Sequence, residues 1–446
     1  MIRAIHSFPR GFVWGTATAA HQVEGDNTNN DWWAWEQLPG RILQGHKSGK
    51  ACDWWGGRWK EDLDRAAQSG QNAHRLSVEW SRIEPSPAVW DEAALDAYRQ
   101  ILRGARDRGL VPMVTLHHFT NPLWVAEQGG WLHADTVALF ERFVRKVVPA
   151  LQDLVDLWVT INEPNIYSAR GYVTGEFPPG EKDVRKSLQV ARNMVLGHAA
   201  AYHAIHAIQP QAQVGLAHQF RGFRPANPRN PLDRWVAQTR SNFVNALVPR
   251  AIHTGRLQSV FGSQRLPQAA RTQDFFGLNY YTVERMAFDP GRAGQLFGRG
   301  FFPQDADLSP TGFIANEPEG LWDALTWAQS YGLPIYITEN GVEDDGDQLR
   351  PRYLATHLRQ VWRAVNFNWP VKGYFHWSLV DNFEWERGWT QRFGLWALDV
   401  ATQARRKRRS ADLYEAVCKA NALSSEMVAT YAPEVWEALF PGSPGG

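Results

Sequence analysis

The amino-acid sequence predicts a single (β/α)8 barrel, that is, a TIM barrel. Short runs rich in β-branched and aromatic residues alternate with longer helix-like segments that carry charges, and no low-complexity linker divides the chain. This alternation is typical of βα units. Barrels of this class hold longer chains than an ordinary domain does, so we expect residues 1–446 to form one domain.

Several segments have the composition of buried strands. They span residues 12–18, 73–79, 111–117, 157–162, 213–218, 274–280, 334–339 and 371–378. Between them lie amphipathic patterns such as DEAALDAYRQILRGARDRG (91–109) and TVALFERFVRKVVPALQDL (136–154), in which apolar residues recur three and four positions apart. An open doubly wound sheet that binds a nucleotide needs a Gly-rich turn, and no G-x-G-x-x-G follows the first strand. The pattern therefore favours a closed barrel.

Two segments stand outside this repeat. Residues 282–320 are rich in Gly, Pro and Asp and are too long for a routine connection, so we expect a long active-site loop region that folds over the C-terminal face of the barrel. Residues 430–446 follow the last helical pattern, and we expect them to form a peripheral tail.

Charge and aromatic content narrow the class of partner. Lys and Arg number 47 against 46 Asp and Glu, a net charge of +1, so no overall field attracts nucleic acid or an anionic membrane. Of the 22 tryptophans, many stand in polar motifs such as NNDWWAWE (29–36) and DNFEWERGW (381–389). Aromatic faces flanked by amides and carboxylates suit a sugar better than a purely apolar ligand. We expect a small neutral partner.

Cysteine use and the N-terminal sequence indicate the compartment. Two cysteines, Cys52 and Cys418, cannot form a disulfide framework and suit a reducing environment. The start MIRAIHSFPRGFVWG lacks a basic stretch followed by a long apolar one, and no run of about 18 apolar residues occurs downstream. We therefore expect a cytoplasmic protein with no membrane span.

Two glutamates stand at the ends of expected strands. WVTINEPN (158–165) places Glu163 before Pro164, and PIYITENG (334–341) places Glu339 before Asn340 and Gly341. Taken alone, the first segment is explained equally well by strand termination, because Pro164 lacks a ladder donor. The C-terminal ends of parallel barrel strands meet on one face, however, so both carboxylates should lie there together, as a two-carboxylate acid/base enzyme requires.

Several longer motifs carry a resemblance to a known family. FVWGTATAAHQVEG, TLHHFTNPLW, TINEPN, GLNYYT, YITENG and WSLVDNFEWERGWTQRFGL occur in that family's order, from about Phe8 to Tyr414. The chain resembles glycoside hydrolase family one, the retaining β-glycosidases. The resemblance implies a (β/α)8 barrel, hydrolysis of β-linked glycosides, and neither a metal nor an organic cofactor.

By this resemblance, Glu163 is the general acid/base and Glu339 the nucleophile. Acetal cleavage with retention needs these two carboxyl groups about 5 to 5.5 Å apart, whereas inversion needs about 6.5 to 9.5 Å. The resemblance also implies that Arg75 and Tyr281 keep the nucleophile ionised and that Asn279 supports the acid. Repulsion between the carboxylates and their burial should raise the pKa of Glu163.

The remaining motif residues match a pocket that forms hydrogen bonds with the hydroxyl groups of a sugar. Those implied to bind the sugar are Gln22, His118, Asn162, Glu384 and Trp385, with Trp377 beneath the ring. The resemblance also implies a cis peptide bond between Trp377 and Ser378. Because Trp385 is retained and Glu384 would repel a phosphate, we expect unphosphorylated glucosides, and we also expect galactosides and fucosides to fit.

Departures from the family pattern lie on the leaving-group side. They are Asn165, Arg170, Phe119 and His21, and they leave the aglycone preference open. His117 and His118 are an unsuitable metal pair, since adjacent strand residues point to opposite faces. The basic run ARRKRRS (404–410) is interpreted as a solvated loop rather than a nucleic-acid patch. Rival functions are a transglycosidase using the same intermediate and a non-catalytic sugar-binding barrel.

Overall fold

The computed structural model describes residues 4–441, and within them eight parallel strands close into a barrel. The barrel strands are β2 (Val13–Ala17), β3 (Ala73–Ser77), β4 (Val111–His117), β5 (Leu157–Asn162), β6 (Gln213–Pro225), β9 (Phe275–Phe288), β11 (Ile335–Asn340) and β12 (Val371–His376). Closure comes from the parallel pairing of β6 with β9. The predicted (β/α)8 barrel is therefore confirmed, and each barrel strand overlaps one of the expected strand segments.

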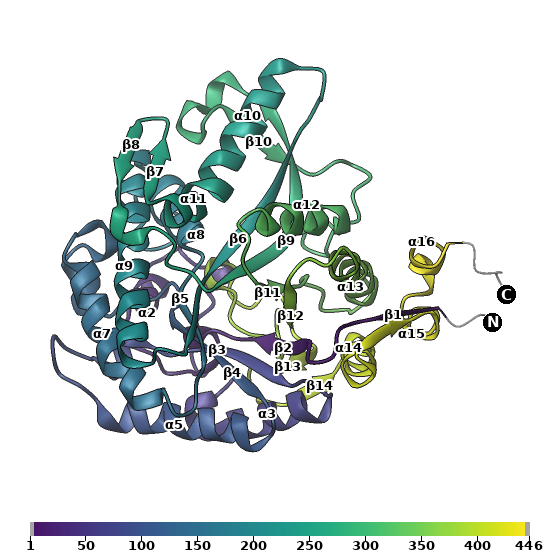
Figure 1. The fold of residues 1–446 in the computed structure, drawn as a ribbon, viewed down its shortest axis with the longest axis horizontal. Coiled ribbons are helices and arrows are strands. Elements are labelled where there is room, and N and C mark those ends of the chain that lie inside the picture. The colour runs from purple at the N-terminus through teal and green to yellow at the C-terminus, as the bar shows by residue number, and fades with distance from the viewer. Residues whose placement is uncertain (1–3, 442–446) are drawn as a thin grey trace.

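Helices surround the barrel, as Figure 1 shows. The longer ones are α3 (Trp59–Gln68), α5 (Glu92–Asp107), α7 (Thr136–Leu151), α9 (Val184–Ile208), α10 (Pro231–Ser241), α11 (Leu247–Thr254), α12 (Pro318–Gln329), α13 (Arg350–Asn366) and α14 (Arg409–Ala420). The two predicted amphipathic patterns form α5 and α7. Asp91 begins α5 because its side chain accepts a hydrogen bond from the Ala94 amide. No helix within residues 4–441 has the length and hydropathy needed to cross a membrane.

Shorter elements lie in the connections. The helices are α1 (Ala20–Val23), α2 (Asp31–Gln37), α4 (Trp80–Ile83), α6 (Leu123–Glu127), α8 (Pro164–Ala169), α15 (Ser425–Tyr431) and α16 (Trp436–Leu439). The short strands are β1 (Ile5–Ser7), β7 (Arg256–Ser259), β8 (Gly262–Arg265), β10 (Gly298–Phe301), β13 (Trp396–Leu398), β14 (Arg405–Lys407) and β15 (Ala422–Ser424). In β4 every residue after Val111 is buried. Parallel barrel strands are covered on both faces, so their sequences do not alternate between apolar and polar residues.

Strands β6 and β9 continue well past the barrel rim. Their pairing runs on to Pro225 and Met286, where β10 adds an antiparallel strand to β9 and α10 covers the ribbon. Figure 1 shows this extension rising above the barrel. The segment expected to fold over the active-site face, 282–320, thus contains the end of β9, the turn at Pro290–Gln295 and β10.

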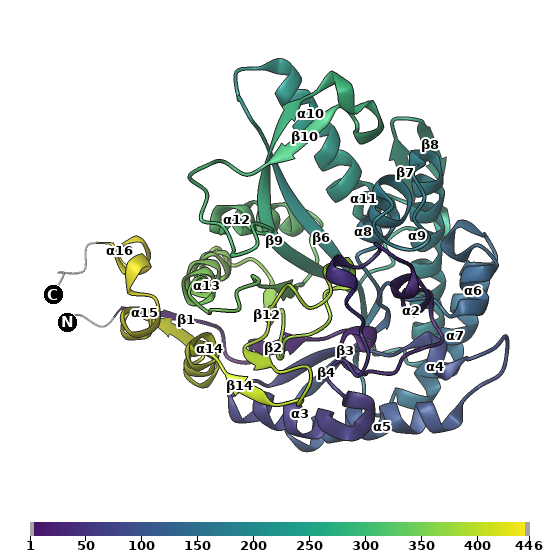
Figure 2. The same cartoon turned by 180° about the vertical axis from the view of Figure 1, so that it is seen from behind.

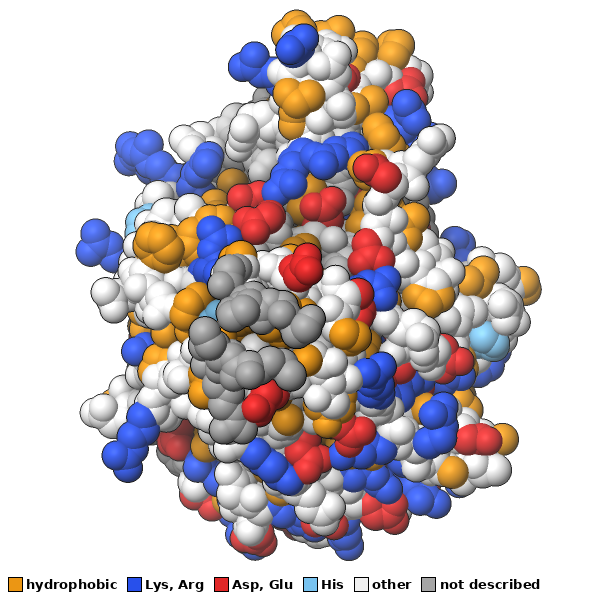
Figure 3. All heavy atoms as spheres, turned by 90° about the vertical axis from the view of Figure 1, so that its right-hand side faces the viewer, with side chains coloured by type: hydrophobic (Ala, Val, Ile, Leu, Met, Phe, Trp, Pro, Cys, Tyr) orange, Lys and Arg blue, Asp and Glu red, His pale blue; other side chains and the backbone are white. Residues whose placement is uncertain are grey.

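The two ends of the described chain meet on one side of the molecule (Figure 2). Strand β1 pairs with β15, and the ring of Phe440 stacks on His6 at 4.6 Å. The expected tail is described as far as residue 441, and residues 442–446 lie outside the described residues. On the face seen in Figure 3, Lys and Arg side chains are interspersed with Asp and Glu, in keeping with the net charge of +1.

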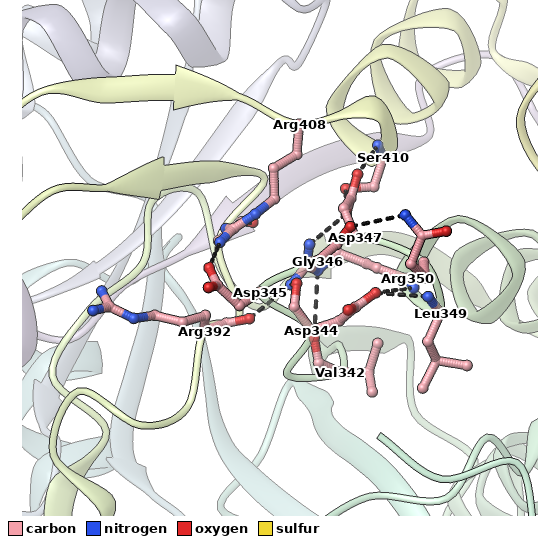
Figure 4. A network of polar contacts seen from close by, with 12 residues as sticks. Val342, Asp344, Asp345, Gly346, Asp347, Leu349, Arg350, Arg392, Arg408 and Ser410 are labelled. Atoms are coloured by element: carbon pink, nitrogen blue, oxygen red, sulfur yellow. Dashed lines mark hydrogen bonds and ion pairs between the residues drawn. The ribbon is translucent and has the colours of Figure 1, made fainter. Parts of the chain in front are cut away.

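The basic run 404–410 is not a simple solvated loop, and that prediction is wrong. Residues 405–407 form β14, which pairs with β13. Arg408 is buried and contacts Asp381 at 2.7 Å, while Arg405 contacts Asp62 at 3.1 Å. The partners come from distant parts of the chain, so local sequence did not reveal them. Figure 4 shows Arg408 reaching toward Asp345 as well.

These contacts belong to a network that fixes the loop after β11. Asp344 accepts hydrogen bonds from the amides of Leu349 and Arg350, which start α13. Asp347 binds both the Arg350 guanidinium and the Ser410 side chain (Figure 4). Through Arg408 and Asp381, the network joins the loop after β11 to the loop after β12.

Replacing Arg408 by alanine should lower the free energy of unfolding by about 3 kcal/mol, because buried Asp381 would keep only the more distant cation of Arg392, 4.0 Å away. Urea denaturation followed by tryptophan fluorescence measures the change. Arg406→Ala is the matched control: Arg406 is an exposed residue of the same run, and its loss should cost less than about 0.5 kcal/mol. Equal losses in the two variants would contradict the role assigned to the buried pair.

Candidate active site

Glu163 and Glu339 lie on the same face of the barrel and line one cleft. Glu163 directly follows β5, and Glu339 is the penultimate residue of β11. Both side chains are buried, at 4 % and 3 % exposure. The structure therefore brings together the two carboxyl groups that the sequence separates.

The backbone at Glu163 turns sharply away from the strand. Its φ of 45° and ψ of 56° lie in the left-handed region, which non-glycine residues rarely adopt. Pro164 then occupies the first turn of α8, where its missing amide hydrogen costs nothing. The turn ends the strand and directs the Glu163 carboxyl toward Asn279, whose amide nitrogen donates to Glu163 Oε1 at 2.8 Å.

Arg75 lies fully buried on β3 between the two glutamate-bearing strands. Its Nη1 contacts Glu339 Oε1 at 2.6 Å, and its Nη2 donates to Asn162 Oδ1 at 2.6 Å. A third donor, Nε, bonds Thr115 Oγ1 at 3.1 Å. Every nitrogen of the guanidinium thus has a partner, as a buried cation requires.

Tyr281 and Asn279 come from β9, the strand beside β11. The hydroxyl of Tyr281 donates to Glu339 Oε2 at 2.5 Å. Asn279 donates to Asn162 Oδ1 at 3.2 Å as well as to Glu163, and its own oxygen accepts from Thr338 Oγ1 at 2.6 Å. Thr338 therefore fixes which end of the Asn279 amide faces the acid.

The two carboxyl groups occupy opposite electrostatic environments. Burial raises the pKa of Glu163, and the nearby charge of Glu339 raises it further. Burial also raises the pKa of Glu339, but Arg75 and the Tyr281 hydroxyl oppose that rise by stabilising the charged form. Glu163 is therefore the group of the pair that holds a proton at neutral pH.

A second group of predicted residues gathers beside Trp385. His118, Trp377, Glu384 and Trp385 line the cleft, and Gln22 lies behind Glu384. The amide nitrogen of Gln22 donates to Phe383 O at 2.7 Å and to Glu384 Oε2 at 3.2 Å. Its oxygen is buried and has no hydrogen-bond partner within the described residues. Burial and the neighbouring Glu386 raise the pKa of Glu384 to about 8.

Aromatic rings pack around this group of residues. Trp377 and Trp385 each stack with His118, at centroid distances of 6.1 Å and 6.0 Å. His118 Nε2 also lies 3.1 Å from the Asn162 amide nitrogen, whereas His117 contacts Trp131 and Asn121 on the other side of the strand. The adjacent histidines therefore point to different surroundings, as predicted.

The peptide bond between Trp377 and Ser378 is cis, as expected. The carbonyl oxygen of Trp377 also lies where a side chain of Gly341 would be, since a Cβ added there would stand 2.0 Å from it. Only glycine fits after Glu339 and Asn340. The glycine of the ENG motif is thus explained by close backbone approach rather than by a turn.

Comparison with known proteins agrees with this geometry. The model of the family Glycosyl hydrolase family 1 matches residues 4–423. The chain belongs to glycosyl hydrolase family 1. Beta-glucosidase A of Thermotoga maritima is 31% identical over 94% of this chain and 99% of its own length. A beta-galactosidase of Sulfolobus acidocaldarius is 32% identical over 94% of this chain and 97% of its own.

A solved structure of similar shape is the beta-glycosidase from Pyrococcus horikoshii. It has a TM-score of 0.89 and 35% sequence identity, and the alignment covers 96% of this chain and 98% of the other. The family 1 match and the structural similarity both span nearly the whole barrel. The chain is accordingly a glycosyl hydrolase with the fold that its sequence predicts.

The family 1 departures noted in the sequence lie around the pocket. Asn165 donates to the carbonyl oxygens of Gln219 and Val244, and so ties α8 to the wall of the cleft. Arg170 forms an ion pair with Glu386. Phe119 and His21 both pack against the ring of Trp385.

Sequence reasoning missed two polar residues that orient the site. Thr115 on β4 and Thr338 on β11 bond Arg75 and Asn279, respectively. The available signal was a hydroxyl in the middle of an otherwise apolar buried strand. Such a group needs a partner, and the partner here is a site residue.

Proposed function

We propose that this chain is a retaining exo-β-glycosidase that hydrolyses unphosphorylated β-glucosides, including cellobiose-like disaccharides and aryl glucosides, and that also accepts β-galactosides and β-fucosides. The observation that carries the proposal is the pair of buried carboxyl groups in unlike surroundings, one facing a cation and a phenol, the other facing a neutral amide. Such a division suits one nucleophile and one acid.

In the first step, the Glu339 carboxylate attacks the anomeric carbon as the glycosidic bond breaks. Glu163 gives its proton to the departing oxygen, so the aglycone leaves as a neutral alcohol. The products are a covalent glycosyl-enzyme ester on Glu339 and a deprotonated Glu163. Arg75 and Tyr281 keep the attacking group ionised beforehand.

In the second step, Glu163 takes a proton from water, which attacks the anomeric carbon and releases Glu339. Esterified Glu339 carries no charge, so the repulsion that raises the pKa of Glu163 is absent and this pKa falls. The same carboxyl therefore serves as an acid first and a base second. Two attacks from opposite sides give retention, for which we predict a carboxyl separation of about 5 to 5.5 Å.

The sugar-binding role falls to the part of the cleft beside Trp385. We assign hydroxyl contacts to Gln22, His118, Asn162, Glu384 and Trp385, with Trp377 against the sugar ring. Trp377 and Trp385 are 3 % and 4 % exposed, which supports a pocket that takes one terminal sugar. The ionised Glu339 and the bulky ring of Trp385 line the cleft there and oppose a phosphorylated sugar.

Three wider features complete the proposal. The chain acts as one catalytic unit, supported by a continuous buried core that runs from Phe8 to Phe440. Segment 282–320 contributes to the active-site face, since Phe313 and Ile314 line the cleft. The buried, unpaired cysteines Cys52 and Cys418 support a reducing compartment such as the cytoplasm.

Hydrolysis of a chromogenic β-glucoside tests the function directly. Wild type should release the chromophore, and Glu339→Ala should reduce kcat by about a thousand-fold or more, because no covalent intermediate can form. Glu61→Ala, which alters an exposed glutamate far from the cleft, serves as the control and should keep the wild-type rate. Equal rates for wild type and Glu339→Ala would remove Glu339 as the nucleophile.

The pH profile tests the assignment of the acid. Because the raised pKa keeps Glu163 protonated at neutrality, kcat/KM for an ordinary aryl glucoside should fall as the pH rises through that pKa. With a dinitrophenyl glucoside, whose leaving group needs no proton, Glu163→Gln should cleave without this alkaline decline. An unchanged alkaline decline in Glu163→Gln would show that another group is the acid.

A further inference from the structure

The extended ribbon of β6 and β9 forms one wall of the active-site cleft. Gln219 pairs with Asn279 at the level of Glu163, and Phe223 pairs with Glu284 further out. At about 3.3 Å per residue, Arg221 lies about 7 Å and Phe223 about 13 Å beyond the acid along the strand. This wall therefore borders the space that receives the departing group.

Four arginines line the cleft, and three of them have carboxylate partners. Arg170 and Arg387 both contact Glu386, and Arg221 contacts Glu284 at 2.6 Å. Arg240, on α10, forms no ion pair with any residue within 4–441. The outer part of the cleft therefore carries one cation that has no direct ion pair and that shares the charge of Glu284 with Arg221.

The charge of Arg240 is compensated only in part, because Glu284 acts on it without a direct ion pair. Its Nε is enclosed and has no hydrogen-bond partner in the described chain, and Nη2 makes a single long contact of 3.4 Å with Gly298 O. Burial lowers the pKa of Arg240; the charge of Glu284 opposes this shift, while the neighbouring Arg221 and Arg292 add to it. An incompletely paired cation in a cleft is costly to the fold, which favours a role with a ligand.

Strand β10 packs closely against these side chains. A Cβ on Gly298 would stand 2.7 Å from Met286 Cε, and one on Gly300 would stand 2.8 Å from Glu284 Oε2. Glycine at both positions therefore lets β10 approach Met286 and Glu284. Gly300 and Arg240 both line the cleft.

The lining beside Arg240 is apolar. Phe223, Val244 and Met286 border the same outer part of the cleft. A flat apolar group would pack against them, while an anionic substituent on it would reach the guanidinium. Arg240 thus marks the end of a slot suited to an aromatic ring that carries a negative charge.

We propose that the aglycone side of this cleft selects β-glycosides of hydroxylated aromatic carboxylic acids, linked through the phenolic oxygen, and that Arg240 is the specificity-determining residue that pairs with the free carboxylate. The inference rests on the proposed glycosidase function and adds the chemical class of the leaving group. Glu284 moderates the site, because its one negative charge is shared by Arg221 and Arg240 and a net charge of one positive unit remains for the ligand.

A matched pair of substrates tests this inference: 4-carboxyphenyl β-glucoside and its neutral analogue, 4-carbamoylphenyl β-glucoside. The measured quantity is the ratio of kcat/KM for the charged substrate to kcat/KM for the neutral one, at low ionic strength. Arg240→Gln should lower the ratio by about ten-fold, the effect of losing one charged hydrogen bond. Arg240→Lys should restore part of it, and added salt should lower the wild-type ratio.

Two further variants separate binding from structure. Glu284→Gln removes a negative charge and should raise the ratio, a change that a purely structural role does not produce. Arg234→Gln alters an exposed arginine of the same helix outside the cleft and should leave the ratio at the wild-type value. If Arg240→Gln does not fold, Arg240→Lys and Glu284→Gln still decide the result.

The outcomes distinguish this inference from the proposed function. Hydrolysis of the neutral substrate with equal ratios in wild type, Arg240→Gln and Glu284→Gln would overturn the role of Arg240 and leave the glycosidase intact. Failure of the wild type to hydrolyse either compound would overturn the proposed function and this inference together.

Discussion

One buried cation, Arg75, connects the two carboxyl groups of this barrel. It binds Glu339 directly, and it binds Asn162, whose side-chain oxygen also accepts from Asn279. Asn279 in turn donates to Glu163. A continuous hydrogen-bonded path therefore runs from one carboxyl to the other across β11, β3, β5 and β9. Because a buried guanidinium is costly unless every donor is paired, this path constrains all four strands at once.

The path also explains why two chemically identical side chains have different electrostatic surroundings. Glu339 receives a cation and a phenolic hydroxyl, both of which stabilise its ionised form. Glu163 accepts a hydrogen bond from the neutral amide of Asn279 and is repelled by the charge of Glu339. Burial and this repulsion both favour its protonated form. The barrel contributes by bringing the ends of strands that are distant in sequence to one face. The chemistry follows from which neighbours each end acquires.

Sequence reasoning located the barrel and both glutamates, and it named residues that the structure gathers around them, because each lies in a local pattern that a strand end or a motif displays. It failed where partners are distant in sequence. Arg405 and Arg408 belong to a basic run that suggested a solvated loop, but both side chains are buried. Arg405 pairs with Asp62, and Arg408 pairs with Asp381. Likewise, the continuation of β6 and β9 past the rim depends on their pairing with each other and with β10, which no local composition reveals. The unpaired charge of Arg240 becomes visible only once those strands are placed.

The central claim is that Glu339 carries the sugar covalently during turnover. A 2-deoxy-2-fluoro β-glucoside with an activated leaving group slows the release of such an intermediate, so the labelled protein can be digested and its peptides examined by mass spectrometry. We predict a single sugar adduct on the peptide that contains Glu339, formed in wild type and lost when the label is allowed to turn over. An adduct on the peptide that contains Glu163, or inactivation with no adduct on the Glu339 peptide, would contradict the assignment.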